Sequence, residues 1–319
     1  MIKKMIYILV VVAVCFAILF SIPLFMSNDN VLINVQKGDS VLVVASRLKE
    51  NKLIYSKKLF LGLVKITKSE NKLKAGAYNF SKKDGILKIL KTLKCGSQNA
   101  LKFTIPEGSN IKQVAAIIAK TVGIDEAKFI RITTDKNLEG YLMPETYFAI
   151  PGMNEEQIIE MMRNEFDKKI TPDMYGKAKE MNVEFKDIVI MASIIEKETN
   201  KPEEKPIISE VFYNRLKKKM MLQSCATVLY AIEVNKADVT IKDTKFQSPY
   251  NTYVHYGLPP GPITNPGIQS IKAALYPANT ENLFFVAVVG NGSHLFAKSF
   301  SGHKKNRQIV KLKQQESKK

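Results

Sequence analysis

The sequence has few of the residues from which metal sites and disulfide frameworks are built. Its 319 residues include three cysteines and three histidines, and His255, His294 and His303 show no ligand spacing. It also lacks a Cys-x-x-Cys pair, a glycine-rich phosphate loop and the Gly-x-Ser-x-Gly elbow of serine hydrolases. We therefore expect a protein that needs no metal and no cofactor, and carboxylates remain as the groups able to do chemistry.

One long stretch near the start of the chain has no charge. Residues 5–26 contain no charged side chain and are long enough to cross roughly 30 Å of hydrocarbon as a helix. Lys3 and Lys4 precede this run and the first base after it is Lys37, so the positive-inside bias predicts a single membrane anchor with residues 1–4 in the cytoplasm. The rest of the chain is then extracytoplasmic, at the cell membrane. A cleaved signal peptide is the alternative, but no clear small-x-small cleavage site follows the run.

The cysteines cannot form a framework of disulfides. Cys15 falls inside the predicted membrane segment, so Cys95 and Cys225 are the two that remain on the outer side. A single optional bridge between them is the most that the sequence allows. The fold must therefore depend on its apolar core, and the 45% hydrophobic content is enough to build one.

Acidic residues are scarce beside basic ones. The chain has 30 Asp and Glu against 48 Lys and Arg, which gives a formal net charge of +18. Because we place the chain outside the cell, we expect no nucleic-acid partner. Anionic envelope polymers or lipid headgroups fit this charge, and a lysine-rich solvated surface without any partner fits it equally.

Residues 31–98 have the pattern of a strand, two helices and a returning strand. Strand alternation, an N-cap serine after turn residues, and apolar spacing at i, i+3, i+4 and i+7 predict these elements at 31–35, 40–51, 56–66 and 75–80. The head of this unit, Val35-Gln36-Lys37-Gly38-Asp39-Ser40, resembles the LysM module, a small domain associated with binding N-acetylated glycan chains. An α+β linker module without a sugar site is the alternative.

Residues 100–302 predict a larger mixed domain, so the fold class of the outer part is α+β. Strands are expected near its two ends and helices between them: strands at 101–105 and 283–289, and helices at 110–119, 155–166, 172–181 and 183–199. The last of these helices is the most apolar one outside the membrane segment and belongs in the core. The basic residues 303–319 are expected to be a solvated tail.

The sharpest local feature is Glu196, an acid near the end of the most apolar helix. It shares a helix face with Phe185, Val189 and Ala192, and that face carries it into or beside the core. Burial there would favour the protonated carboxyl, the form that a general acid requires; a glutamate on a surface rim is the alternative. Glu198 lies about 200° around the helix, so a second acid must come from elsewhere, or the mechanism must use one carboxyl.

A second feature is the loop between residues 248 and 267, where helical and strand periodicity disappear. Seven of the eleven residues from Gly257 to Gly267 are glycine or proline. Prolines lower the entropy lost when a long loop orders, and glycines permit its tight turns, so the loop can form a rigid wall. Tyrosines and asparagines beside it suit sugar rings, although a purely structural loop has the same composition.

In this order, these features resemble the endolytic murein transglycosylase family, also called the YceG-like family. Six stretches carry the resemblance, which runs from about residue 31 to the last predicted strand: Ile105–Gly108, Leu138–Tyr147, Ala192–Thr199, Asn214–Leu216, Met221–Ser224 and Tyr250–Gly267. The family implies a membrane anchor, a LysM-like module and a catalytic domain that acts on peptidoglycan glycan strands. It also implies association with peptidoglycan synthases.

The resemblance implies that Glu196, the first glutamate of the Glu-Lys-Glu-Thr sequence, is catalytic. The reaction would be non-hydrolytic cleavage of the bond between N-acetylmuramic acid and N-acetylglucosamine. Glu196 would protonate the glycosidic oxygen and then take the proton of the muramic acid C6 hydroxyl, which closes onto C1 and leaves a 1,6-anhydro end. Because the substrate supplies its own nucleophile, this mechanism needs no second carboxylate.

Further site residues are suggested by motif position and hydrogen-bonding type. We expect Gln223, Asn251, Tyr253 and Asn265 to line the substrate cleft. The family usually has Asp after Leu-Gln-Ser, whereas this sequence has Cys225, which puts electrostatic help from that position in question. Two alternatives from other classes remain: a non-catalytic scaffold that binds the envelope, and a hydrolytic muramidase.

Overall fold

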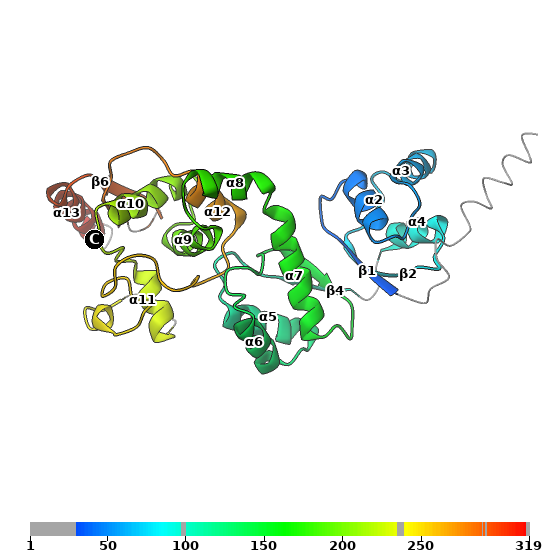
Figure 1. Cartoon of the computed structure of the whole chain (residues 1–319), viewed down its shortest axis with the longest axis horizontal. Helices are drawn as coiled ribbons and strands as arrows, with labels where there is room; N and C mark the ends of the chain where they lie inside the picture. Colours follow the sequence, from blue (N-terminus) through cyan, green and yellow to red (C-terminus); the bar gives the residue numbers. More distant parts are fainter. Residues whose placement is uncertain (1–29, 97–99, 235–238, 289, 291, 317–319) are drawn as a thin grey trace, which may run out of the picture. The chain divides into compact units, whose positions relative to one another are not determined.

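The computed structural model describes residues 30–96, 100–234, 239–288, 290 and 292–316, and Figure 1 shows their helices and strands. Contacts divide these residues into two compact units, each described here by itself. The first runs to Thr104 and also takes in residues 121–123 and 146–153; the second contains the remainder. We predicted a boundary near residue 100, and the structure differs because a later strand pairs back onto the segment after it.

The predicted membrane segment, residues 5–26, and the preceding residues 1–4 lie outside the described residues. Within the described ranges, no helix combines the length and the apolar character that a membrane crossing requires.

The first unit begins with the predicted order of strand, helix, helix and strand, and this prediction is confirmed. Its elements are β1 (Asn30–Val35), α2 (Val41–Glu50), α3 (Lys57–Ile66), β2 (Gly76–Ser81) and an additional helix that we did not predict, α4 (Ile86–Cys95). The two strands pair antiparallel, with Ile33 opposite Tyr78. Tyr78 and Phe80 are buried in the unit's own core and stack with ring centroids 5.7 Å apart.

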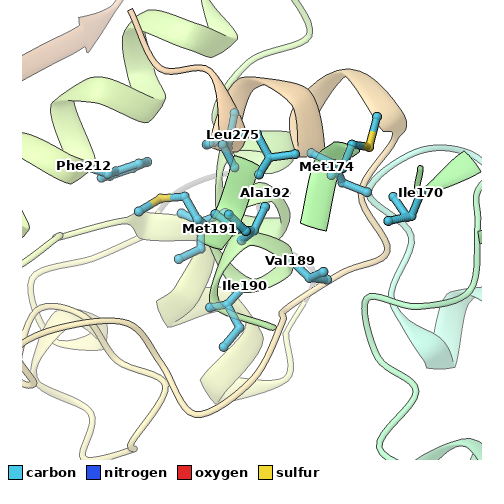
Figure 2. Packing of buried hydrophobic residues seen from close by; sticks show 14 of the residues in the cluster. Ile170, Met174, Val189, Ile190, Met191, Ala192, Phe212 and Leu275 are labelled. Carbon is cyan, nitrogen blue, oxygen red and sulfur yellow. The ribbon is translucent and has the colours of Figure 1, made fainter. Parts of the chain in front are cut away.

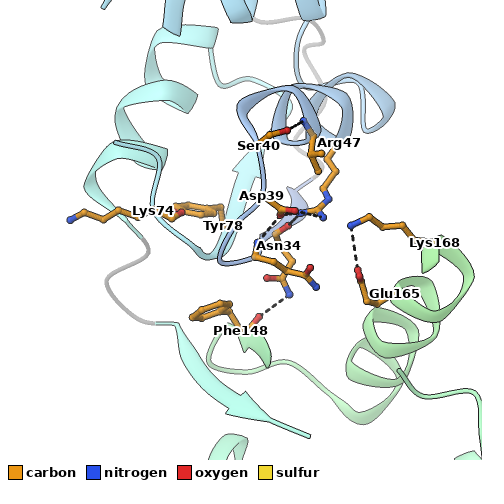
Figure 3. Close-up of polar contacts among 11 residues, drawn as sticks. Asn34, Asp39, Ser40, Arg47, Lys74, Tyr78, Phe148, Glu165 and Lys168 are labelled. Atoms are coloured by element: carbon orange, nitrogen blue, oxygen red, sulfur yellow. Dashed lines mark hydrogen bonds and ion pairs between the residues drawn. The ribbon is translucent and has the colours of Figure 1, made fainter. Parts of the chain in front are cut away.

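Local capping explains why the helices of this unit begin where the sequence predicts. The Ser40 hydroxyl accepts a hydrogen bond from the backbone of Val43 at 3.3 Å, and the Ser56 hydroxyl caps α3 in the same way. Asp39, in the turn before α2, accepts the backbone N–H of Gln36 at 2.8 Å and pairs with Arg47 on the helix (Figure 3). The turn and the first helix are therefore held together by one carboxylate.

A second strand pair completes this unit. The strands β3 (Leu101–Thr104) and β4 (Thr146–Ala149) are antiparallel, with the Thr104 and Thr146 hydroxyls 2.9 Å apart. The side-chain amide of Asn34 on β1 donates to the carbonyl of Phe148 on β4 at 3.4 Å (Figure 3). The predicted strand at 101–105 is confirmed, and its partner β4 was not predicted.

The second unit is mainly helical, and the mixed α+β class is confirmed. Its elements in chain order are α5 (Ile111–Val122), α6 (Glu126–Asp135), α7 (Glu155–Lys169), α8 (Pro172–Glu180), α9 (Phe185–Glu198), α10 (Lys205–Lys217), α11 (Cys225–Ile232), the short 3₁₀ helix η1 (Asp243–Lys245), α12 (Ile268–Leu275), β5 (Phe284–Ala287), β6 (His294–Ala297) and α13 (Phe300–Glu316). The four helices that we predicted correspond to α5, α7, α8 and α9.

Helix α9 is the centre of this unit. Every residue from Ile188 to Glu196 is buried, because α8, α10, α11 and α12 all pack against the helix. Figure 2 shows Met191 and Ala192 of α9 among side chains of α10 and α12, including Phe212 and Leu275. A helix covered on all sides is apolar all round, as its sequence predicts.

The basic segment after residue 303 forms most of helix α13, and most of its described side chains are exposed. Within this helix Val310 is buried and the ring of His303 stacks on Phe284 at a centroid distance of 5.3 Å. We did not predict the helix itself, because its apolar residues are few and are separated by lysines. The strand before it, predicted at 283–289, is confirmed as β5, which pairs with β6.

Candidate active site

Glu196 lies in the last turn of α9 and is 6% exposed. The prediction that the apolar helix face carries this acid into the core is therefore confirmed. Its carboxyl group is surrounded by hydrogen-bond donors. Oε1 accepts from the Lys205 ammonium at 2.9 Å, while Oε2 accepts from the Gly267 backbone N–H at 2.9 Å and the Ser270 hydroxyl at 2.7 Å.

These three donors come from the starts of two helices. Lys205 is the first residue of α10, Gly267 is the N-cap of α12, and Ser270 lies in the first turn of α12. A helix N-terminus favours a nearby negative charge, and a buried charge requires a partner of opposite sign. The surroundings of Glu196 therefore supply its carboxyl group with hydrogen-bond donors and a positive charge. The sequence-based expectation considered desolvation only and did not foresee the lysine.

A second carboxyl group lies at the same place, and sequence reasoning missed it. The turn at Gly108 packs on Glu196: a Cβ on Gly108 would lie 3.4 Å from Cγ of Glu196. The side chain of Glu107 contacts Gly267, since a Cβ built there would lie 1.8 Å from Oε1 of Glu107. Glu107 is exposed, and partial burial together with the charge of Glu196 raises its pKa. Its position in the Ile105–Gly108 motif was the available signal.

Asn265 joins the segments that form this site. Its backbone N–H donates to the Ser109 carbonyl at 2.9 Å, and its carbonyl accepts from Gly108 at 2.9 Å. Its side-chain amide accepts from Gly140 and Leu142 at 3.0 and 2.9 Å and donates to the Ser109 carbonyl at 3.0 Å. The side chain is 0% exposed. Asn265 therefore fixes the turn that carries Glu107 relative to the loop that carries Gly267.

Glu139 is a partly buried acid that is bonded to this junction. Its carboxyl accepts the N–H of Ile111, at the start of α5, at 3.1 Å and the Asn265 amide at 3.1 Å. Burial raises the pKa of Glu139 to about 7, although the backbone hydrogen bonds lower it in part. The group therefore titrates close to neutral pH while supporting the asparagine that positions the site.

The proline- and glycine-rich loop is fixed to α9, as expected of a rigid wall. The Ile263 N–H donates to the Ser193 hydroxyl at 3.0 Å, and the Thr264 hydroxyl donates to the Ser193 carbonyl at 3.3 Å. Gly140 packs so tightly on Pro262 that an added Cβ would lie 2.6 Å from the ring. Both contacts require small or polar residues at positions that the sequence supplies.

The remaining predicted residues gather around a different part of α9. The Ser224 hydroxyl, at the N-cap of α11, donates to Glu198 at 2.5 Å. Gln223 is exposed with a φ of 53°, and its N–H donates to the Thr252 carbonyl at 3.0 Å. Glu196 and Glu198 thus have partners on different elements, in agreement with the predicted angle between them.

Tyr253 and Asn251 differ in exposure. The Tyr253 hydroxyl lies 3.2 Å from the sulfur of Cys225, and its ring is half-buried. Asn251 is 0% exposed; its amide donates to the carbonyls of Thr244 and Phe246 and accepts from the Tyr253 N–H at 2.9 Å. Asn251 has all its polar groups engaged inside the loop, so it holds Tyr253 in place. Its predicted role in the cleft is untested, and only an indirect one fits this burial.

The two described cysteines are not joined by a disulfide. Cys95 and Cys225 are free thiols in the structure, so the optional bridge is not formed. Burial raises the pKa of Cys225, which keeps the thiol neutral at the position where the family usually has an acid. Among the residues placed in the structure, no three His, Cys, Asp or Glu side chains are grouped as a metal site.

The sequence matches the model of the YceG-like family over residues 33–309, a span that contains the whole site and most of both units. The chain belongs to the YceG-like family. A relative from Bacillus subtilis (strain 168), named endolytic murein transglycosylase, is 38% identical over 88% of this chain and 84% of its own length. One of the same name from Streptococcus pneumoniae serotype 2 is 29% identical and matches over 58% of its own length.

A solved member of the YceG-like family has the same fold. The crystal structure of a yceG-like protein from Listeria monocytogenes is 32% identical in sequence and matches with a TM-score of 0.60. The match covers 88% of this chain and 99% of the other. The family assignment made from the six sequence motifs is confirmed.

Proposed function

We propose that this YceG-like chain is an endolytic lytic transglycosylase that cleaves glycan strands of peptidoglycan between N-acetylmuramic acid and N-acetylglucosamine. The product is a 1,6-anhydromuramic acid end, formed without water. The observation that carries this proposal is Glu196, a buried carboxylate held by a lysine, a hydroxyl and a backbone N–H beside the exposed Glu107 turn. Relatives that match over most of the chain are named endolytic murein transglycosylases.

The chemistry requires a base for the C6 hydroxyl of the muramic acid residue. Glu196, which is fixed by three donors, accepts that proton while O6 attacks C1. Its rigid placement removes the cost of orienting the base in the transition state. Because the nucleophile is part of the substrate, exclusion of water from C1 decides between the anhydro product and hydrolysis.

Four residues complete the proposed cleft in two ways. Gln223 and Tyr253 have exposed or half-exposed polar groups and are proposed to contact the glycan. Asn251 and Asn265 are fully buried and are proposed to act indirectly, by fixing the loops that carry Tyr253 and the Glu107 turn.

The position of the enzyme in the envelope follows from the sequence. We propose that residues 5–26 anchor it in the cell membrane, that residues 1–4 are cytoplasmic, and that both units lie outside. The LysM-like module predicted at residues 31–98 is proposed to contact glycan. An anchored enzyme near peptidoglycan synthases would cut new strands soon after they are made, which limits their length.

End-group analysis tests this function. The full chain in detergent is incubated with purified peptidoglycan, and the ends of the released strands are identified by mass spectrometry. We expect 1,6-anhydromuramic acid ends with the native protein and none with Glu196→Gln. Reducing ends alone would establish a hydrolytic muramidase, and no new ends would favour a non-catalytic scaffold.

A further inference from the structure

The surroundings of Glu196 raise a question about the source of the catalytic proton. Cleavage needs a proton on the glycosidic oxygen, yet both oxygens of Glu196 accept hydrogen bonds, one of them from an ammonium group. All three hydrogen-bond partners of Glu196 donate to it and one of them carries a positive charge, so the geometry suits this carboxyl group to accept a proton as a base.

We propose that Glu107 is the second catalytic carboxyl of the active site: it protonates the glycosidic oxygen, while Glu196 accepts the proton of the C6 hydroxyl. This inference rests on the proposed function. It assigns the two proton transfers to two residues that are 89 positions apart in the sequence.

The geometry places the two carboxyls on either side of one glycine. Gly267 donates its N–H to Oε2 of Glu196 at 2.9 Å, and its Cα side is covered by the carboxyl of Glu107. Gly108, which follows Glu107, lies beside Glu196, since a Cβ added to it would be 3.4 Å from Cγ of Glu196, and its carbonyl accepts from the Lys197 ammonium at 3.4 Å. Glu107 is therefore held by backbone contacts against the Glu196 site while its carboxyl stays exposed.

The charges at the site favour one proton on Glu107. The groups that face it are Glu196 on α9, Lys205 on α10, Lys169 on α7 and Glu145 before β4. Lys205 is bonded to Glu196, and Lys169 is bonded to Glu145 at 2.6 Å, so each lysine already neutralises another carboxylate. Partial burial and then the charge of Glu196 raise the pKa of Glu107. Glu107 is therefore favoured to keep a proton at a pH where an ordinary glutamate has lost it.

The proton balance closes over one turnover. The O–H bond of Glu107 breaks as the glycosidic oxygen gains its proton and the C1–O bond cleaves. The bond from O6 to C1 forms as the O6–H proton passes to Glu196. The two carboxyls have then exchanged protonation states, and one proton returns from Glu196 to Glu107 through solvent before the next cut. No water is consumed, and no oxidant or reductant is required.

A substrate with an activated leaving group separates the two roles. Dinitrophenolate leaves C1 without protonation, so a dinitrophenyl β-glycoside of a peptidoglycan oligosaccharide needs the base and not the acid. We expect Glu107→Gln to lose about 100-fold or more on peptidoglycan, the usual contribution of a general acid, and to stay within about tenfold of the native rate on the aryl glycoside. Glu196→Gln should be inactive on both.

Two further variants control for structure. Glu203→Gln removes another exposed carboxylate, which lies in the loop before α10, and should leave both rates unchanged. Gly267→Ala keeps the N–H that reaches Glu196, and its φ of −72° suits alanine, but the new Cβ occupies the place of the Glu107 carboxyl. It should reproduce the Glu107→Gln pattern with both glutamates present.

The pH profile supplies a readout that a structural role would not move. For the native enzyme, kcat/KM on peptidoglycan should fall on the alkaline side as Glu107 loses its proton, and this limb should be absent with the aryl glycoside. The proposal would be overturned if Glu107→Gln lost the same factor in rate on both substrates, or lost no rate on either. It would also be overturned if the aryl glycoside restored the rate of Glu196→Gln and not that of Glu107→Gln. In each case anhydro ends made by the native enzyme would still support the proposed function.

Discussion

The backbone N–H of Gly267 points to Oε2 of Glu196 at 2.9 Å. This contact connects the buried helix α9 to a loop whose composition is dominated by glycine and proline. The loop therefore does more than form a wall, because its last residue is also the N-cap of α12 and supplies one of the three donors to the carboxylate. Changes at Gly267 or Glu196 should therefore affect both the stability of the protein and its activity.

Removing the lysine partner should expose the cost of a buried charge. Lys205→Met leaves Glu196 without its counter-ion, and loss of one member of a buried ion pair typically destabilises a protein by about 3–5 kcal/mol. The free energy of unfolding, measured in urea, should fall by that order. The double variant Lys205→Met with Glu196→Gln removes both charges and should recover most of the loss. Additive losses in the double variant would contradict the ion-pair account.

Glu139 should make the second unit less stable as the pH rises. Its folded pKa of about 7 lies above the ordinary glutamate value of 4.5, so the folded state binds the proton more tightly than the unfolded chain. The stabilisation is complete below about pH 4.5 and is lost between there and about pH 7, by up to about 3 kcal/mol.

Urea unfolding at several pH values checks this linkage. The native chain should lose stability relative to Glu139→Gln between about pH 4.5 and 7, because the glutamine cannot ionise. A difference between the two proteins that does not change with pH would show that Glu139 has an ordinary pKa.

Asn265 should be far more sensitive to truncation than an ordinary buried amide. Asn265→Ala leaves the N–H groups of Gly140 and Leu142 without their acceptor and loosens the turn that carries Glu107, so we expect at least about 3 kcal/mol of destabilisation and lower activity of the folded enzyme. Asn154→Ala, which removes the N-cap of α7, should cost about 1 kcal/mol and leave kcat unchanged. Equal effects of the two variants would argue against a positioning role for Asn265.

Gln223 allows a test of substrate contact without backbone strain. Its φ of 53° is one that glycine adopts freely, so Gln223→Gly removes the side chain and keeps the loop. Loss of one hydrogen bond to the glycan should raise KM about tenfold with little change in kcat. Steady-state kinetics on glycan strands of defined length measure this split, and an unchanged KM would remove Gln223 from the cleft.

Local signals in the sequence predicted the elements that depend on neighbouring residues. Ser40 and Ser56 cap their helices because the hydroxyl and its partner N–H are three residues apart. The face of Glu196 followed from the helical repeat alone, and the structure confirms that it is buried. Such features need no knowledge of the rest of the fold.

Two of the three partners of Glu196 were not predicted because they come from distant segments, Gly267 and Ser270 lying 71 and 74 residues away along the chain. Lys205 is only nine residues away, but it lies on the next helix, so no periodic pattern links it to the acid. Helix α13 was not predicted for a related reason: it packs on β5 and β6, which a one-dimensional pattern does not show. Family motifs marked Ile105–Gly108 but gave it no role.

Cleavage of the bond between N-acetylmuramic acid and N-acetylglucosamine without water is tested most directly by isotope incorporation. Peptidoglycan is digested by the full chain in water enriched in oxygen-18, and the new muramic acid ends are weighed by mass spectrometry. We predict new ends whose mass is lower than that of a reducing end by one water molecule, with no oxygen-18 incorporated. New ends that carry one oxygen-18 atom at C1 would show that water is the nucleophile and would contradict this prediction.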